Sequence, residues 1–433
     1  MVTRRKRRSA VVPEQPSGSL AIQMPPEKAE PASMGNVLMM VVPMLGSTGA
    51  MIFMAVQNNG GNNTRSLLMG GGMLVAMLGM VGFNMYRQFS QYRTRVVTQR
   101  REYLSYLAET RDAVRKVAKK QRAYYNWVYP DPNALVTLAA NGSRLWSREG
   151  GTYDLFAFRY GSGTQPLGLV FERPPIDPMT EMDVVCLSAM ERFINVHDHT
   201  DNVGKFLFLG DFSHIELAGE GEAVYDEMRA IMMHLACFID PSKLKIAVLC
   251  SADRLGEWEW VKWMPQARSS IVRDAVGPAR MISTDPAELA EMIGTDIAMR
   301  GPFQYGDEIP AYPHLLLVCD GAEFPASSPF GSFSGIKGVT IMSRAREWTP
   351  MKSHTTLRLL IHPNPDRKGA DVVDVITMDS MPEQAFADRL SAVQAEAIAR
   401  RMTPFATQQN LEEADTPVGR SDESRQKDLM ELV

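Results

Sequence analysis

Two apolar stretches decide the fold expected near the N-terminus: GNVLMMVVPMLGSTGAMIFMAV at 35–56 and SLLMGGGMLVAMLGMVGFNMY at 66–86. They contain 22 and 21 residues and no charged side chain. Each is close to the roughly 20 helical residues that cross a hydrocarbon core. Residues 57–64 between them are uncharged and rich in Asn and Gly, which suits a turn. The pattern predicts a two-helix transmembrane hairpin over 34–86; a buried helical pair is the alternative.

Basic residues on both sides of this region predict its orientation. Five lie at 4–8 and five more follow residue 86 before residue 102, whereas Arg65 is the only cation between the two runs. Cationic flanks stay in the cytoplasm. We therefore expect a two-pass membrane protein, with both termini and the main domain cytoplasmic.

Charge divides the chain into a basic part and an acidic part. Residues 1–122 contain 18 Lys and Arg against 6 Asp and Glu, and the rest contains 28 against 44. The basic part, with a Pro-rich tail at 1–33, suits contact with anionic lipid. The acidic remainder argues against nucleic acid as a partner, because phosphate binding needs a basic face.

Residues 87–130 are expected to form a cytoplasmic stalk helix. Leu107 and Val114 are seven residues apart and belong to a heptad-like apolar seam that polar residues interrupt. Such a seam is suited to docking on a partner or a neighbouring subunit. Packing of the stalk against its own domain is the alternative that the sequence leaves open.

Residues 131–402 alternate between short apolar runs and amphipathic segments, which predicts an α/β domain with a mixed or largely parallel sheet. The expected strands are 155–160, 205–209, 244–250, 279–282, 315–319, 338–343, 356–361 and 372–377. The expected helices are 222–238, 256–264, 286–299 and 382–402. Residues 403–433 are expected to be a linker toward further domains.

The chain has no Gly-x-x-x-x-Gly-Lys-Ser/Thr phosphate-binding loop. Gly219 and Gly221 stand at the equivalent place before a helix, but glutamates at 220 and 222 have the wrong charge for ATP. Asp320 ends an apolar run, LLLVCD, in the manner of a Walker B carboxylate. We consider a magnesium role for Asp320 beside a structural role in capping or turn formation.

Three of the six tryptophans lie close together, at Trp258, Trp260 and Trp263. Helical spacing places the last two on one face. At least one of the three is a candidate for docking on a partner, with core packing as the alternative.

Two blocks, LWSREGGTYDLFAFRYGSG from 145 and WEWVKWMPQAR from 258, resemble the N-terminal half of EccC, the FtsK/SpoIIIE-type ATPase of type VII (ESX) secretion systems. The first block matches at Leu145, Trp146, Arg148, Asp154, Arg159, Gly161 and Gly163. The second matches at Trp260, Lys262, Trp263 and Pro265, while Gln266 replaces the usual histidine.

The resemblance implies a degenerate P-loop-NTPase-like α/β domain that follows the hairpin and stalk, with ATP and magnesium bound by motor domains outside these residues. It also implies an inner-membrane complex with EccB, EccD and EccE, and a hexameric motor that moves secreted helical substrates. We expect the chain to anchor and couple that motor, with little or no ATP hydrolysis of its own. A nucleotide-independent scaffold is one alternative, and an FtsK-like DNA translocase subunit is another.

Overall fold

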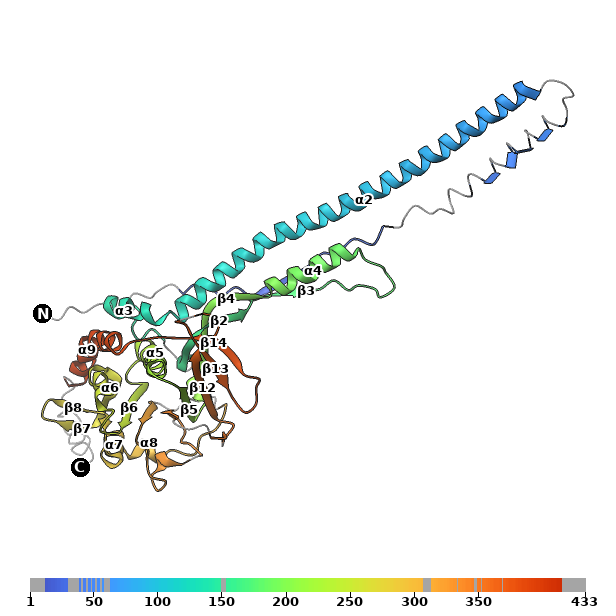
Figure 1. Cartoon of the computed structure of the whole chain (residues 1–433). Coiled ribbons are helices and arrows are strands. Elements are labelled where there is room, and N and C mark those ends of the chain that lie inside the picture. The colour runs from blue at the N-terminus through green and yellow to red at the C-terminus, as the bar shows by residue number, and fades with distance from the viewer. Residues whose placement is uncertain are drawn as a thin grey trace, which may run out of the picture. The chain divides into compact units, whose positions relative to one another are not determined.

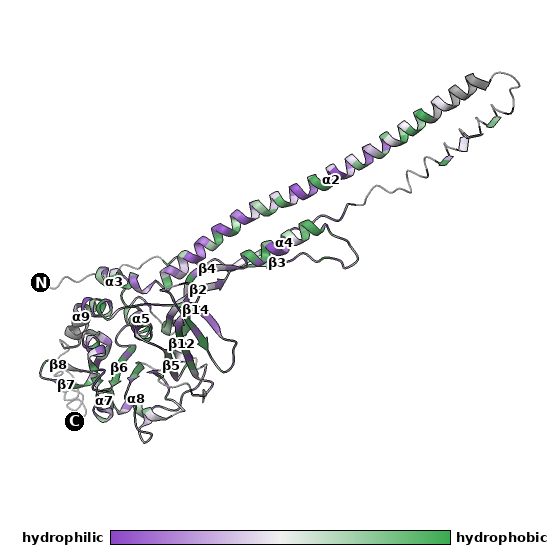
Figure 2. Cartoon of the chain, in the orientation of Figure 1, coloured by the Kyte–Doolittle hydropathy of each residue, from purple (hydrophilic) through white to green (hydrophobic). Residues whose placement is uncertain are grey.

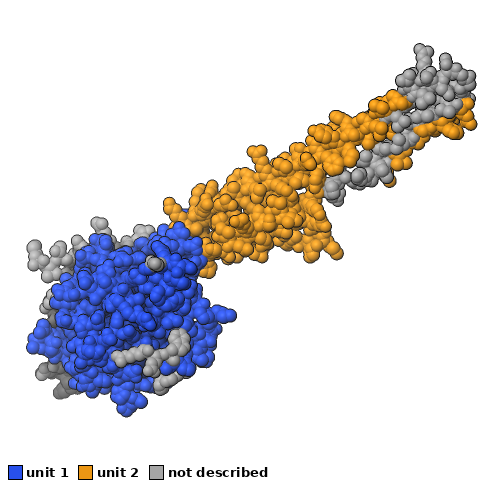
Figure 3. Space-filling view, in the orientation of Figure 1, with its two compact units in different colours: residues 1–15, 120–165, 200–433 blue, residues 16–119, 166–199 orange. Residues whose placement is uncertain are grey.

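The computed structural model describes residues 12–29, scattered positions between 39 and 57, and 63–414 with gaps at 149–152, 307–312, 333, 346–348, 352 and 368. The chain divides into two compact units (Figure 3). Unit 1 comprises 1–15, 120–165 and 200–433, and unit 2 comprises 16–119 and 166–199. Residues 166–199, which the sequence assigns to the α/β domain, therefore cluster with the stalk.

Unit 2 is built on the long helix α2 (Asn63–Val128), the helix α4 (Val184–His197) and a parallel pair of strands, β1 (Gly18–Ala21) and β3 (Leu169–Glu172). Asp183 caps α4 by accepting hydrogen bonds from the backbone N–H groups of Val185 and Cys186. The same carboxylate pairs with Arg100 of α2 at 2.8 Å. Because Asp183 both caps α4 and pairs with Arg100, it fixes α4 to α2.

The membrane prediction is contradicted by this structure. The second apolar run, 66–86, forms roughly the first third of α2, and charged residues follow from Arg87 onward. Most of the first run lies outside the described residues. In the part of the chain that the structure describes, no helix is both long enough and apolar enough to cross a membrane. The prediction of a two-pass inner-membrane protein is therefore wrong, and the hairpin is not confirmed.

Unit 1 contains a ten-stranded mixed sheet in the order β4-β2-β14-β13-β12-β5-β11-β10-β6-β9 (Figure 1). The strands from β12 to β9 pair in parallel, and β12, β13, β14 and β2 pair antiparallel. Their bounds are β2 (Ala157–Pro166), β4 (His199–Phe208), β5 (His214–Gly219), β6 (Leu244–Cys250), β9 (Ile282–Ser283), β10 (His314–Asp320), β11 (Val339–Arg344), β12 (Thr356–Pro363), β13 (Asp371–Ile376) and β14 (Glu383–Ala387).

Strand β10, near the middle of the parallel part of the sheet, is buried on both faces. Leu316 and Val318 of β10 pack into a core with the helices α3 (Pro132–Asn141), α5 (Glu222–Phe238) and α9 (Ala392–Ala414). Leu315 and Leu317 point the other way, into a core with α7 (Pro286–Ile293) and α8 (Thr295–Ala298). Side chains that alternate along β10 therefore pack against helices on both sides of the sheet. Figure 2 accordingly shows β6 as hydrophobic.

The remaining elements are the short helix α6 (Leu255–Trp258) and the hairpin of β7 (Arg268–Asp274) and β8 (Gly277–Arg280). Short 3₁₀ turns lie at 153–156, 209–211, 259–263, 265–267 and 329–331. The turn at 259–263 continues α6 through the tryptophan block.

The predicted α5 and β6 have the observed bounds, but the other three predicted helices differ. The helix expected at 256–264 is divided into α6 and the 3₁₀ turn at 259–263. The helix expected at 286–299 is interrupted at Gly294, whose φ of +97° disfavours any residue with a Cβ. The helix expected at 382–402 begins only at Ala392, because residues 383–387 form β14 between β13 and β2. α9 then continues to Ala414, into the segment expected as a linker.

Candidate functional site

The glycine loop and Asp320, which the sequence singles out, lie at the same edge of the sheet. Gly219 and Gly221 separate β5 from α5, and Asp320 is the last residue of β10. β5 and β10 are both parallel to β11, which lies between them. Carboxyl ends of parallel strands are where α/β proteins bind ligands, so this edge is the candidate functional site.

The glycines of the loop have a structural explanation. Gly219 has φ of +146°, and a Cβ there would come within 2.4 Å of the carbonyl oxygen of Ile361 in β12. Gly221 has φ of +69° and is the N-cap of α5. Close approach of β12 and a left-handed turn therefore require glycine at these positions without any bound phosphate.

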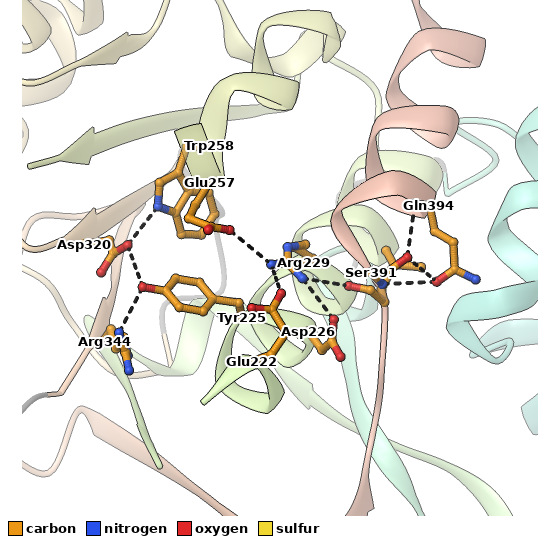
Figure 4. A network of polar contacts seen from close by, with 11 residues as sticks. Glu222, Tyr225, Asp226, Arg229, Glu257, Trp258, Asp320, Arg344, Ser391 and Gln394 are labelled. Carbon is orange, nitrogen blue, oxygen red and sulfur yellow. Dashed lines mark hydrogen bonds and ion pairs between the residues drawn. The ribbon is translucent and has the colours of Figure 1, made fainter. Parts of the chain in front are cut away.

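The first residue of α5, Glu222, is paired within the chain (Figure 4). Arg229, whose side chain is 1% exposed, forms ion pairs with Glu222, with Asp226 at 2.9 Å and with Glu257 at 3.6 Å. Arg229 also donates to the carbonyl oxygen of Leu390 at 3.3 Å, just before α9. The guanidinium of Arg229, which lies beside the glycine loop, therefore binds oxygen atoms of the protein.

Asp320 is buried and accepts two hydrogen bonds at one carboxylate oxygen (Figure 4). Trp258 Nε1 donates to Oδ2 at 3.0 Å, and the Tyr225 hydroxyl donates to it at 3.2 Å. The Tyr225 hydroxyl in turn accepts from Arg344 at 2.9 Å. Burial, followed by the negative charge of Asp320, raises the pKa of Tyr225, which keeps the phenol protonated as a donor. Asp320 is therefore held by the protein itself.

A magnesium ion at Asp320 would need access to the carboxylate. The side chain is 1% exposed, and the indole and phenol lie on it. Among the described residues, no cluster of three or more His, Cys, Asp or Glu side chains is arranged to hold a metal ion. The geometry favours the structural role for Asp320.

Two of the three tryptophans are buried in unit 1, and the third is partly buried. Trp258 is 1% exposed and Trp260 is 5% exposed. Trp263 is partly buried, with the guanidinium carbon of Arg400 in α9 at 4.3 Å from its ring centroid. This placement corresponds to the core-packing alternative, and the block holds α9 in place.

Leu107 and Val114 are also covered by the chain. They are 3% and 2% exposed and belong to the core of unit 2, together with Cys186, Met190 and Phe193 of α4. The seam of the stalk packs on its own unit, which is the alternative to partner docking. α4 was not expected from the sequence.

Comparison with known proteins identifies the relatives of the chain. No family model matches it. It is 32% identical over 415 residues to the ESX secretion system protein EccC of Thermomonospora curvata, covering 94% of this chain and 30% of that protein. The chain belongs to the EccC family.

Other EccC proteins match shorter parts. EccC3 of the ESX-3 system of Mycobacterium tuberculosis is 32% identical over 249 residues, or 57% of this chain and 18% of that protein. EccCa1 of the ESX-1 system of the same species is 27% identical over 328 residues, or 71% and 40%. The chain therefore spans less than half the length of each of these EccC proteins.

The residues that carry the resemblance to EccC fasten the end of α2 to the sheet. Arg148 donates to the carbonyl oxygens of Val128 and Ala157, and Trp146 Nε1 donates to that of Ala236 at 3.1 Å. Arg159 of β2 donates to the carbonyl oxygen of Tyr129 at 2.9 Å. Carbonyl groups at the end of α2, which have no partner within the helix, thus accept hydrogen bonds from Arg148 and Arg159.

Arg159 also forms a buried bidentate pair with Asp388, at 2.7 and 2.9 Å. Glu227 of α5 accepts a hydrogen bond from the backbone N–H of Asp388 at 2.7 Å. Burial, followed by the negative charge of Asp388, raises the pKa of Glu227 well above its ordinary range. The sequence did not single out Glu227, Tyr225, Arg229 or Arg344. Each of them makes at least one contact with a residue 95 to 161 positions away along the chain, which no local pattern marks.

Proposed function

We propose that this chain serves type VII secretion as a coupling part of an EccC assembly, joining ATPase domains to other components of the export machinery. Membership of the EccC family supports the secretion role. The chain spans 30% of the T. curvata protein. That this chain shares the secretion role of the whole EccC protein is therefore also proposed.

The coupling part of the proposal rests on the contacts at the end of α2. Arg148 binds the last carbonyl group of α2, and Arg159 binds that of Tyr129, which follows the helix. Arg159 also pairs with Asp388, which lies just before α9. Buried bidentate pairs of this kind fix geometry strongly. A displacement of α9 is thereby transmitted through Asp388 and Arg159 to the end of α2.

We further propose that unit 1 works without bound nucleotide. The observation that carries this step is the carboxyl edge of the sheet, where Trp258 and Tyr225 occupy Asp320 and Arg229 binds Glu222. A phosphate at this loop would meet carboxylates at 220 and 222. Catalysis then belongs to other ATPase domains, and EccB, EccD and EccE are the proposed partners.

The test is copurification from cells that coexpress the tagged full chain with EccB, EccD and EccE of the same system. We expect at least one component to copurify, and capture of none would contradict the docking role. Arg148→Gln is expected to reduce export of an ESX substrate while copurification persists. Arg115→Gln, which removes an exposed pair with Asp112 on α2, is the matched control and should change neither.

ATP turnover separates this proposal from a nucleotide-responsive domain. The full chain should hydrolyse ATP negligibly. Robust turnover that disappears in Asp320→Ala would overturn the nucleotide-independent role and leave the copurification result unaffected.

A further inference from the structure

A line of exposed side chains runs along helix α2 within unit 2. Its members follow one another at intervals of four, four, three, four and three residues, which brings them to one face of a helix. They are Arg93, Val97, Arg101, Leu104, Ala108 and Arg111. All six are exposed, including 63% of Val97 and 43% of Leu104. We call this surface the α2 stripe.

The α2 stripe is distinct from the buried seam of the same helix. Leu107 and Val114 belong to the core of unit 2. Leu104 and Arg111 each lie three residues before one of these two, and helix geometry turns them about 60° away from it. The seam therefore packs within unit 2, whereas the stripe remains open to a partner.

The three arginines of the α2 stripe carry positive charge that the described part of the chain does not compensate. None of them forms an ion pair with a described residue. By contrast, Arg115 on the same helix pairs with Asp112 at 3.8 Å. Burial, followed by the charges of Arg111 and Arg115, lowers the pKa of His197 in α4. The positive potential therefore extends from α2 to the neighbouring helix.

We propose that the α2 stripe binds an acidic amphipathic helix of another protein, with apolar residues of that helix against Val97 and Leu104 and its carboxylates against the three arginines. Spacings of four and three residues are those by which two helices interlock their side chains. Carboxylates would supply the charge complementarity that the stripe lacks within its own chain. A second copy of this chain would present the same arginines, and like charges disfavour that pairing. The inference goes beyond the proposed coupling role and does not depend on it.

The pattern of the α2 stripe favours a helix over an anionic lipid surface. A helix that lies on lipid has a broad apolar face bordered by cations. In the stripe, apolar and basic residues instead alternate along one narrow line. Exposed cations also lie off the stripe, at Arg95, Lys116 and Lys120, and a lipid surface would attract both sets.

Fluorescence anisotropy with the purified full chain and a labelled synthetic helix of about four heptads tests the proposal. The peptide carries leucines to face Val97 and Leu104 and glutamates to face the arginines. A peptide of the same composition, shuffled so that its leucines share no face, is the control. At about 0.15 M salt, which screens exposed charges more than about 8 Å apart, the first peptide should bind saturably and the shuffled one at least about tenfold more weakly. Equal binding of the two peptides, or no saturable binding of the first, would overturn the proposal.

Two triple variants separate the α2 stripe from the general basicity of the helix. Loss of the stripe charges, by Arg93→Gln, Arg101→Gln and Arg111→Gln together, should weaken binding of the first peptide by about tenfold. The matched control removes the same charge from exposed positions off the stripe, by Arg95→Gln, Lys116→Gln and Lys120→Gln, and should weaken it by less than about twofold. Equal losses in the two variants would contradict the proposal. All six positions are exposed, so both variants should keep the fold, which circular dichroism checks.

Two further measurements distinguish a helix from a general attraction of anions. Leu104→Gln leaves the charge unchanged and should weaken binding of the first peptide by about threefold. An unchanged affinity would mean that charge alone binds the peptide, and the proposal would fail. Vesicles of phosphatidylglycerol should bind the two triple variants equally well. A loss of vesicle binding confined to the stripe variant would assign the stripe to lipid instead.

Discussion

The two ends of strand β10 hold buried polar groups in opposite states. At the carboxyl end, Asp320 receives hydrogen bonds from Trp258 and Tyr225. At the amino end, Arg268 lines a cavity, and its Nε has no partner in the described part of the chain. At the end that resembles a nucleotide site the buried carboxylate is satisfied by the protein, whereas at the other end a buried N–H group has no acceptor among the described residues.

The difference between the two ends shows that a sequence motif need not mark a binding site. A carboxylate at the end of an apolar strand suggests magnesium, but two aromatic donors convert it into a packing element. A single arginine in a hairpin belongs to no motif that predicts binding. Burial of its Nε–H group without an acceptor nevertheless costs free energy. Whether a buried polar group finds a hydrogen-bond partner therefore depends on the elements packed around it rather than on its residue type.

The largest effect that tests this comparison is expected from Trp258→Ala. The side chain is 1% exposed, and its removal should lower the free energy of unfolding by about 3–5 kcal/mol. Urea unfolding followed by circular dichroism measures it. Trp263→Ala, at a partly buried position, is the matched control and should cost clearly less. Equal costs would mean that Trp258 is not the element that closes the carboxyl end.

A pH dependence is expected at the amino end from His314, the first residue of β10. Burial, followed by the charge of Arg300, lowers the pKa of His314 to about 3. Below about pH 6.5 the unfolded chain takes up a proton that the folded chain refuses, so stability falls as pH falls from 6.5 toward 3. Between pH 6.5 and 5 this amounts to roughly 2 kcal/mol.

The measurement is the urea midpoint as a function of pH for wild type and for His314→Gln, which retains a donor toward Thr340. The variant should lose less stability than wild type over this range. Parallel curves for the two proteins would contradict the buried neutral state of His314.

The smallest effect is expected from Glu222→Gln at the glycine loop. The Glu222 side chain is 62% exposed, and Arg229 retains Asp226 as a partner, so the cost should be about 0.5 kcal/mol or less. The variant should also gain no affinity for ATP, as measured by equilibrium dialysis. Appearance of ATP binding would mean that one glutamate alone had closed a nucleotide site.

The sequence predicts the parts of unit 1 whose signals are local. Apolar strands such as 244–250 and the amphipathic helix 222–238 have the expected bounds. Strand β5, at 214–219, was not expected, although it leads directly into the glycine loop. Its alternation is short, and hydrogen bonds to β11 and β12, far along the chain, decide its conformation.

The sequence points to single residues of the candidate site but not to their arrangement. The sequence marks Asp320 as the end of an apolar strand and the two glycines as the start of a helix, but it does not bring them to one edge of the sheet. The donors on Asp320 come from positions 62 and 95 residues away, which no spacing rule connects. The unpaired Nε of Arg268 was missed entirely, since a missing acceptor is visible only when the surrounding elements are in place.

The most direct test of the central claim is a calorimetric titration of the full chain with ATP and magnesium, with wild type beside Asp320→Asn. The account predicts no saturable heat for either protein, because Trp258, Tyr225 and Arg229 already occupy the groups that a nucleotide site would use. Saturable binding to wild type that Asp320→Asn abolishes would contradict it.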